Sequence, residues 1–347
     1  MDTRESLQEL KTRVGDLRRL ARAETMERTE GPGRGSRATR LSLIGGLDLE
    51  VLPDRGLDIG AASWQGTPLA WLSPADAAAP GSLDPGSEGW RRSFGGGLLV
   101  TCGLDQFGVE STDERGALPM HGRAHRLSAT GLSTWSRQAG DDWEIGASGE
   151  TRQATPFDEN LRLSRSITTS LQDRSLRISD QVTNDAHIRW PHMLLYHFNF
   201  GWPLIAEGTR IGVSYVVDGI RVDCVEPEPR DDDARRGLEE WDRVDRLSVD
   251  GPEQVFSLTF PPRAEVSVRI ESPRAGLSAN LRFLSSELPV LYLWKSLRPG
   301  ANVLGVEPAN SPGIHGQARL REEGGLPVLR PDETRTYELR LDIEPLR

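Results

Sequence analysis

This sequence has few cysteines and no long hydrophobic run. Among its 347 residues only Cys102 and Cys224 carry thiols, and MDTRESLQEL at the start contains no apolar stretch typical of a secretory signal. Two cysteines give no disulfide framework, so we expect two reduced thiols in a cytoplasmic protein. No apolar run approaches the ~20 residues that a membrane helix needs, so we expect no membrane association.

Positive charge is also scarce relative to negative charge. The chain has 42 Lys and Arg against 52 Asp and Glu, a net charge of -10 and a pI near 5.3. A nucleic-acid binder should carry a basic patch or stripe, and outside the Arg-rich N-terminal segment none is evident. We therefore expect no nucleic-acid partner, whereas a neutral small molecule is compatible with this charge.

Turn-forming residues are abundant, with 36 Gly and 23 Pro. Residues 1–25 have leucines at helical spacing and predict a short N-terminal helical segment. From 26 to 347 the chain consists of short segments in which apolar and polar residues alternate. This pattern predicts one all-β domain built as a large sandwich or barrel. The segment 73–93 predicts an irregular loop of functional or mobile character, and the charged segment 226–246 predicts a solvated surface loop.

Histidine occurs only six times, and three histidines lie in HIRWPHMLLYHFNF. In a strand, side chains alternate between faces, so His197 and Asn199 share one face while Tyr196, Phe198 and Phe200 share the other. The aromatic row predicts core packing. The polar row fits either a sugar-binding platform or a satisfied polar pair at a sheet edge, and spacing alone does not decide between them.

Glu307 follows the apolar stretch VLGV and precedes a proline, which places it near a strand end where catalytic carboxylates are common. An exposed charge at a turn is the plainer alternative. His121 and His125, in PMHGRAHR, have the spacing of helical metal ligands, but the neighbouring Gly and Pro argue against a helix. We therefore predict no metal site, and no nucleophile motif is present.

Several other side chains are candidates for binding a sugar. Arg55 lies between two aspartates in LPDRGLDIG, where a local ion pair is as good an explanation as ligand binding. Asp105 ends the glycine-rich block GGGLLVTCGLD and could accept sugar hydroxyls. Trp294 beside Lys295 could offer a stacking face, although core packing is the commoner role of such a tryptophan.

Taken together, the blocks LPDRGLDIG, GTPLAWLSP, GGGLLVTCGLDQFG, MHGR, YHFNFGWPL and VLGVEPAN resemble the aldose 1-epimerase family, in its DUF4432 branch of the galactose mutarotase-like superfamily. The resemblance runs from about Val14 to the C-terminus. It implies a β-supersandwich of two large antiparallel sheets with a sugar cleft on one concave face.

The resemblance also implies roles for individual residues. His197 would act as general acid, Glu307 as general base, and His121 would bind the sugar at the catalytic site. Mutarotation needs a base at the anomeric hydroxyl and an acid at the ring oxygen, and it requires no cofactor or metal. We expected the pair on facing strands, separated by a bound ring. The predicted substrate-contacting set is Arg55, Asp105, Arg123, His125, His192, Asn199, Trp294 and Lys295.

The sequence departs from typical mutarotases. YHFNF is shorter than their usual motif. The blocks around Arg55 and Asp105 favour a different substrate, such as a modified or phosphorylated sugar, or a related isomerisation. Two alternative functions stay open: a metal-dependent isomerase or lyase that uses the histidine cluster with Glu307, and a non-catalytic carbohydrate-binding protein. The expected partner is a small sugar or sugar derivative, and a homodimer is a candidate assembly.

Overall fold

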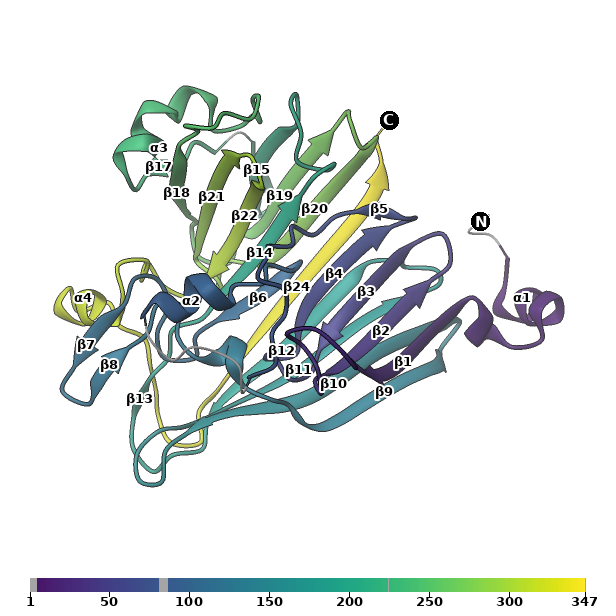
Figure 1. The fold of residues 1–347 in the computed structure, drawn as a ribbon, viewed down its shortest axis with the longest axis horizontal. Helices are drawn as coiled ribbons and strands as arrows, with labels where there is room; N and C mark the ends of the chain where they lie inside the picture. The colour runs from purple at the N-terminus through teal and green to yellow at the C-terminus, as the bar shows by residue number, and fades with distance from the viewer. Residues whose placement is uncertain (1–4, 81–86, 224, 347) are drawn as a thin grey trace.

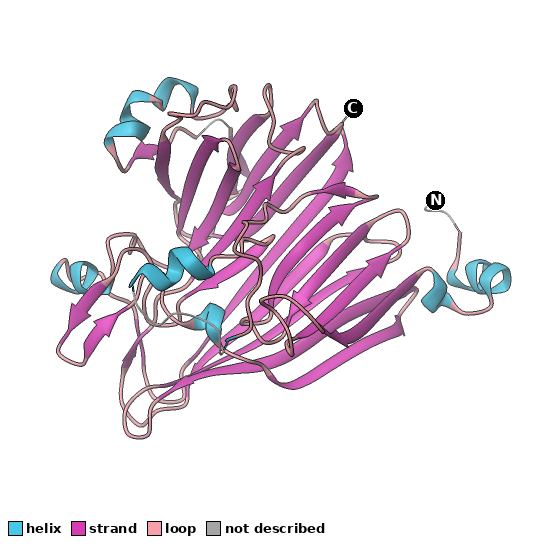
Figure 2. Ribbon diagram, viewed as in Figure 1, coloured by secondary structure: helices cyan, strands magenta, loops and turns pink. Residues whose placement is uncertain are grey.

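The structure is a computed structural model that describes residues 5–80, 87–223 and 225–346. Within these residues, strands dominate, and the few helices lie at the periphery (Figure 2). Two antiparallel sheets stack on each other as a sandwich (Figure 1). The expected all-β architecture of two large antiparallel sheets is confirmed. No helix in the described part of the chain is long and apolar enough to cross a membrane.

The first sheet carries the N-terminal strands and the candidate site. Its described strands run in the order β1-β2-β3-β4-β6-β14-β22-β21-β18-β17, with β5 paired to β4. Their bounds are β1 Ala21–Glu27, β2 Arg37–Leu43, β3 Leu47–Leu52, β4 Asp58–Trp64, β5 Thr67–Pro68, β6 Leu99–Cys102, β14 Leu195–Gly201, β17 Glu228–Pro229, β18 Glu253–Thr259, β21 Val290–Arg298 and β22 Ala301–Ala309.

The second sheet covers the back of the first, in the order β16-β15-β19-β20-β24-β12-β11-β10-β9. Two short strand pairs lie outside both sheets, the hairpin of β7 with β8 and the pairing of β13 with β23. The bounds are β7 Ser111–Asp113, β8 Gly116–Leu118, β9 Thr130–Ala139, β10 Asp142–Ala154, β11 Asn160–Ser170, β12 Leu176–Asn184, β13 Trp190–Pro191, β15 Arg210–Val217, β16 Ile220–Val222, β19 Glu265–Ser272, β20 Leu277–Leu284, β23 Val328–Leu329 and β24 Thr334–Pro345.

The described helices are short: α1 Leu7–Val14, α2 Ser87–Ser93, α3 Asp232–Arg236 and α4 Gln317–Glu322, with single 3-10 turns at Leu17–Arg19, Ala124–Arg126 and Leu238–Glu240. α1 begins with a capping box between Ser6 and Glu9 and ends at Gly15, whose φ is 74°. The helical segment is thus shorter than the expected 1–25. Residues Ala21–Glu27 instead form β1, which pairs antiparallel with β2.

Two clusters of buried side chains hold the sandwich together. The larger cluster fills the space between the sheets, where alternating residues such as Leu161, Leu163 and Ile167 of β11 point inward. The smaller cluster lies on the other face of the first sheet and joins Trp90 of α2 to Val100 and Leu195. α2 therefore packs over β6 and β14 (Figure 1), inside the segment 73–93 that we expected to be irregular.

The other local expectations have mixed outcomes. The strands β2 and β3 form a hairpin across Gly45 and Gly46. The charged segment 226–246 is largely exposed, but it contains β17, α3 and a 3-10 turn. Its backbone is held by Lys295, whose Nζ donates to the carbonyls of Glu240 and Arg243. Cys102 is a buried free thiol, and Cys224 lies outside the described residues.

Candidate active site

The strand β14 presents two polar side chains on the face away from the sandwich core. Tyr196, Phe198 and Phe200 belong to the large cluster between the sheets. His197 and Asn199 alternate with them and so point to the opposite face. The predicted division of this strand into an aromatic face and a polar face is confirmed.

Glu307 reaches the same face from the neighbouring strand β22. Phe198 pairs with Val306, and Asn199 pairs with Gly305, so the antiparallel register sets His197 opposite Glu307. The His197 Nε2 atom lies 3.3 Å from Glu307 Oε1. This differs from the expected arrangement, in which facing strands would hold the two groups a sugar ring apart. Adjacent strands of one sheet place directly paired side chains in contact.

Burial keeps this pair in its uncharged form. Desolvation raises the pKa of Glu307 from 4.5 to about 8. Desolvation, with His121 nearby, lowers the pKa of His197 well below 6.5. Near neutral pH the two groups therefore share one proton. Gly305 makes room for the carboxylate, because a Cβ atom there would lie 2.5 Å from Glu307 Oε1.

His121 joins the pair from a tight turn. Its φ of 57° lies in the left-handed region, and Gly122, with φ of 73°, packs against the carbonyls of Gly103 and Gln106. This turn brings the His121 ring to 5.8 Å from the His197 ring, measured between centroids. Burial lowers the pKa of His121 to about 4. The structure thus brings together His121, His197 and Glu307, the three predicted catalytic residues.

Aromatic rings enclose these polar groups. The Trp90 ring lies 4.5 Å from His121 and 4.8 Å from His125. The Phe94 ring stacks on Trp90 at 4.7 Å and lies 5.5 Å from His197. We call Trp90 and Phe94 the aromatic roof.

Two further rings form a wall. The Trp294 ring meets His197 at 5.6 Å, and the Trp71 ring meets Trp294 at 6.3 Å and Phe94 at 5.7 Å. His197 and Glu307 are only 5% and 3% exposed beneath the roof. The polar groups thus lie beneath a cover of aromatic rings, and we call this cluster of rings and polar side chains the chamber.

Polar atoms in this chamber lack protein partners. Among the described residues, the buried atoms without a hydrogen bond include Glu307 Oε1, His197 Nδ1, His121 Nδ1, His125 Nδ1 and Asn199 Oδ1. Buried polar atoms are nearly always hydrogen-bonded, so the concentration of such atoms at one place marks a candidate ligand site.

Other predicted contacts lie elsewhere or bind protein groups. Asp105 accepts a hydrogen bond from Gln153 and lines, with Arg123, a separate cavity of about 220 Å³. His192 bonds the Leu104 carbonyl and the Tyr337 hydroxyl. Lys295 follows Trp294 and so points to the opposite face of β21.

Arg55, also in the predicted contact set, donates to three backbone carbonyls. His125 borders the roof and accepts a hydrogen bond from Arg126. No group of three or more His, Cys, Asp or Glu in the described part of the chain is placed to hold a metal ion.

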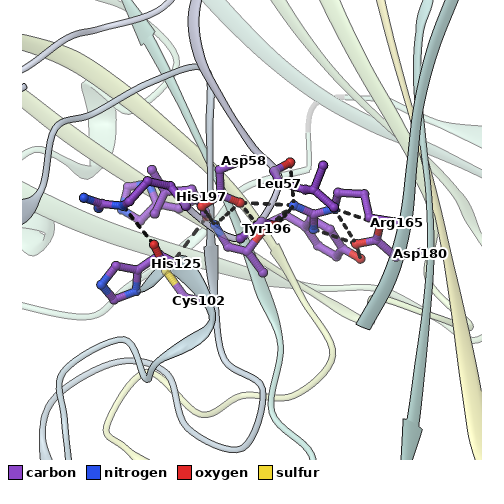
Figure 3. Close-up of polar contacts among 12 residues, drawn as sticks. Leu57, Asp58, Cys102, His125, Arg165, Asp180, Tyr196 and His197 are labelled. Atoms are coloured by element: carbon purple, nitrogen blue, oxygen red, sulfur yellow. Dashed lines mark hydrogen bonds and ion pairs between the residues drawn. The ribbon is translucent and has the colours of Figure 1, made fainter. Parts of the chain in front are cut away.

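The sequence analysis missed a buried ionic network beneath β14. Arg165 of β11 is bonded to Asp180 at 2.6 Å and to Asp58 at 3.1 Å, and the Tyr196 hydroxyl donates to Asp180. Figure 3 shows Arg165 and Asp180 on one side of Tyr196, and His197 with His125 on the other. A signal was present, because Arg165 and Asp180 occupy inward positions of alternating strands.

The roof was also missed. Trp90 and Phe94 lie in or beside the segment 73–93, whose composition predicts only a loop. Trp71 belongs to the block GTPLAWLSP, which contributed to the resemblance without a role of its own. Nothing in the local pattern indicates that these rings meet over β14.

Comparisons with known proteins agree with this architecture. The family described as "Domain of unknown function (DUF4432)" matches residues 33–343. A candidate aldose 1-epimerase from Klebsiella pneumoniae is 22% identical, with a TM-score of 0.83 over 93% of this chain and 84% of that one.

A galactose 1-epimerase from Lactobacillus acidophilus is 11% identical, with a TM-score of 0.56 over 94% of this chain and all of that one. A galactose mutarotase-like protein from Clostridium acetobutylicum is 15% identical, with a TM-score of 0.60 over 93% and 99% of the two chains. At such identities the likeness shows the fold, which is the galactose mutarotase-like sandwich. No curated protein matches the chain.

Proposed function

The chain belongs to the DUF4432 family, and from that premise and the site above we propose that it is a carbohydrate isomerase of the aldose 1-epimerase type. The observation that carries the proposal is the buried contact of His197 with Glu307, inside an aromatic chamber with unpartnered polar atoms. Family membership and fold leave the activity open, because one fold serves many functions. The chemistry of the pair supports this reaction.

The reaction needs an acid and a base at two oxygens of one carbon. The Glu307 carboxylate takes the proton of the anomeric hydroxyl, the bond from the anomeric carbon to the ring oxygen breaks, and protonated His197 delivers its proton to that oxygen. Because both oxygens are bonded to the anomeric carbon, two side chains in contact can serve them together. Ring closure after rotation reverses both transfers.

The single proton of the pair suits this exchange. Transfer of that proton from Glu307 to His197 over 3.3 Å gives the carboxylate and the imidazolium that the first step requires. Desolvation raises the pKa of Glu307 and so keeps it protonated. Hydrogen bonds from substrate hydroxyls to the carboxylate lower this pKa and favour the ionised form. His121 and Asn199 offer further hydrogen bonds to the sugar.

The site favours an uncharged aldose over the phosphorylated sugar that the sequence blocks suggested. The three cations in the predicted contact set, Arg55, Arg123 and Lys295, donate to backbone carbonyls of the protein. The chamber walls are tryptophan and phenylalanine rings, which suit the apolar face of a pyranose. A phosphate group would lose its hydration shell on binding, and no cation of the predicted contact set is available to pair with it, so its binding is unfavourable.

An exchange measurement with Glu307→Gln tests the proposal. We expect the wild type to accelerate the exchange of α and β anomers of at least one aldose in a panel, measured by NMR magnetisation transfer. Glu307→Gln should lower the enzymatic rate by a factor of about 10² or more, because it removes the base.

Glu322→Gln, at an exposed position, is the matched control and should leave the rate unchanged. Equal exchange in the wild type and Glu307→Gln would refute the assignment. Binding of a sugar without any exchange would favour a non-catalytic binding protein.

A further inference from the structure

Arg55 is a buried cation whose three side-chain nitrogens all contact backbone carbonyls. Nε donates to His125 O at 2.9 Å, Nη1 to Ala78 O at 3.1 Å and Nη2 to Ser93 O at 3.1 Å. Arg55 is 8% exposed, and its attraction to Asp58 only partly offsets desolvation. A substrate anion could reach this guanidinium only by displacing a carbonyl, so a direct contact with substrate is disfavoured.

The three carbonyls belong to segments that build the chamber. Ser93 ends α2 and precedes Phe94, so its carbonyl belongs to the backbone that connects the two residues of the aromatic roof. His125 lies in the turn that begins at His121 and faces the Trp90 ring. Ala78 belongs to the stretch that leads from Trp71 toward α2. One guanidinium therefore links the roof to the histidine turn.

The histidine side of this link is rigid. The turn that carries Arg55 bonds directly to the segment after His125, through Gly56 N to Leu127 O at 2.8 Å and Ala129 N to Pro53 O at 2.7 Å. A Cβ atom at Gly56 would lie 2.8 Å from Ala124 O, so the two turns are in close backbone contact. Arg55 extends from this fixed base to the roof.

We propose that Arg55 is a positioning residue that holds the aromatic roof and the His121 turn together over the His197–Glu307 pair. Hydrogen bonds from a charged donor are stronger than neutral ones, and three of them converge here from one side chain. Loss of the guanidinium opens the chamber locally and leaves the acid–base pair itself intact. The catalytic part of this role rests on the proposed function, whereas the structural part does not.

Five of the six histidines of the chain provide a residue-resolved test of the structural part. His125 and His197 lie under the roof at 1% and 5% exposure, while His192 is equally buried but bonded to Leu104 and Tyr337 away from it. His187 and His315 are exposed. Diethyl pyrocarbonate acylates accessible imidazoles, and peptide mass spectrometry assigns the labelling rate of each histidine.

In Arg55→Met we expect the labelling rates of His125 and His197 to rise roughly tenfold or more, through local opening. His192 should stay protected, and the two exposed histidines should react as in the wild type. Arg123→Met, which removes a bond to Ala117 O, is the control and should change none of the rates. Unchanged rates in Arg55→Met, or a parallel rise at His192, would overturn the proposal.

Arg55→Lys keeps the charge but reaches fewer carbonyls. We expect a smaller gain in labelling at the same two histidines, and this variant decides the question if Arg55→Met does not fold. A second experiment measures anomer exchange. The value of kcat/KM should fall roughly 10- to 100-fold in Arg55→Met, and it should fall less in Arg55→Lys. Selective labelling without exchange in any protein would uphold the role of Arg55 and refute the proposed activity.

Discussion

Glu307 is a buried carboxyl group whose Oε1 atom accepts no hydrogen bond from the protein. It contacts His197, which burial also keeps neutral. A group of this kind is costly for stability and is typical of functional sites, where a shifted pKa serves proton transfer. At the residue scale, the cost of Glu307 can be measured without knowing any substrate.

The stability of the protein should depend on pH through Glu307. Its pKa is about 8 in the folded state against 4.5 for the unfolded reference, so the folded state retains a proton that the unfolded chain releases. Stability from this group is complete below pH 4.5 and is lost as pH rises through 8. Relative to Glu307→Gln, the wild type should lose about 3 kcal/mol between pH 5 and pH 8.

Urea unfolding of both proteins at the two pH values measures this difference. Glu322→Gln, with an exposed carboxyl, should follow the wild type at both. Parallel pH curves for the wild type and Glu307→Gln would show that Glu307 is solvated in the folded state.

At the scale of single elements, the helix α2 supplies Trp90 to the site. It spans only Ser87–Ser93, and its Trp90 contacts His121, His125 and Phe94. A helix this short has little intrinsic stability, so tertiary contacts such as those of Arg55 and Trp90 must hold it in place.

Removal of the Trp90 ring should weaken substrate binding more than it slows the chemistry. In Trp90→Ala we expect KM for the best aldose to rise about tenfold, from the loss of about 1 kcal/mol of ring contact, while kcat changes less. Steady-state polarimetry gives both constants. The control is Trp202→Ala, because Trp202 is 57% exposed and stacks with Arg274 on another surface. Equal effects of the two substitutions would contradict a role of α2 at the site.

At the scale of the whole molecule, Arg165 ties the two sheets together. It projects from β11 of the second sheet and bonds Asp180 of the same sheet and Asp58 of the first. The network also contacts Tyr196, the neighbour of His197 in β14. The sandwich therefore contains a polar connection directly beneath β14.

Breaking this network should destabilise the fold far more than breaking a surface ion pair. Asp180→Asn leaves the buried guanidinium of Arg165 with a weakened partner, and we expect a loss of about 3 kcal/mol in the free energy of unfolding. Asp223→Asn removes an exposed pair with Arg221 and should cost less than about 1 kcal/mol. Denaturant unfolding compares the two, and similar losses would contradict a structural role for the network.

The sequence by itself determined the all-β class and the two faces of the strand at His197, because alternation with a period of two is a local property of a strand. The resemblance supplied Glu307 and His121 as partners of His197, and the structure does bring these three together. Arg165 and Asp180 could have been recognised as buried charges, since they interrupt inward apolar rows.

Only the tertiary structure decided which strands are neighbours and which side chains close the chamber. The contact of His197 with Glu307 depends on the register of two strands about a hundred residues apart, which no local pattern encodes. The bonding of Arg55 to carbonyls, the position of Lys295 on the far face of its strand, and the roof of Trp90 and Phe94 all arise from long-range packing. Each of these contacts joins segments that are far apart in the sequence, so its geometry is set by the tertiary packing and not by the local residue pattern.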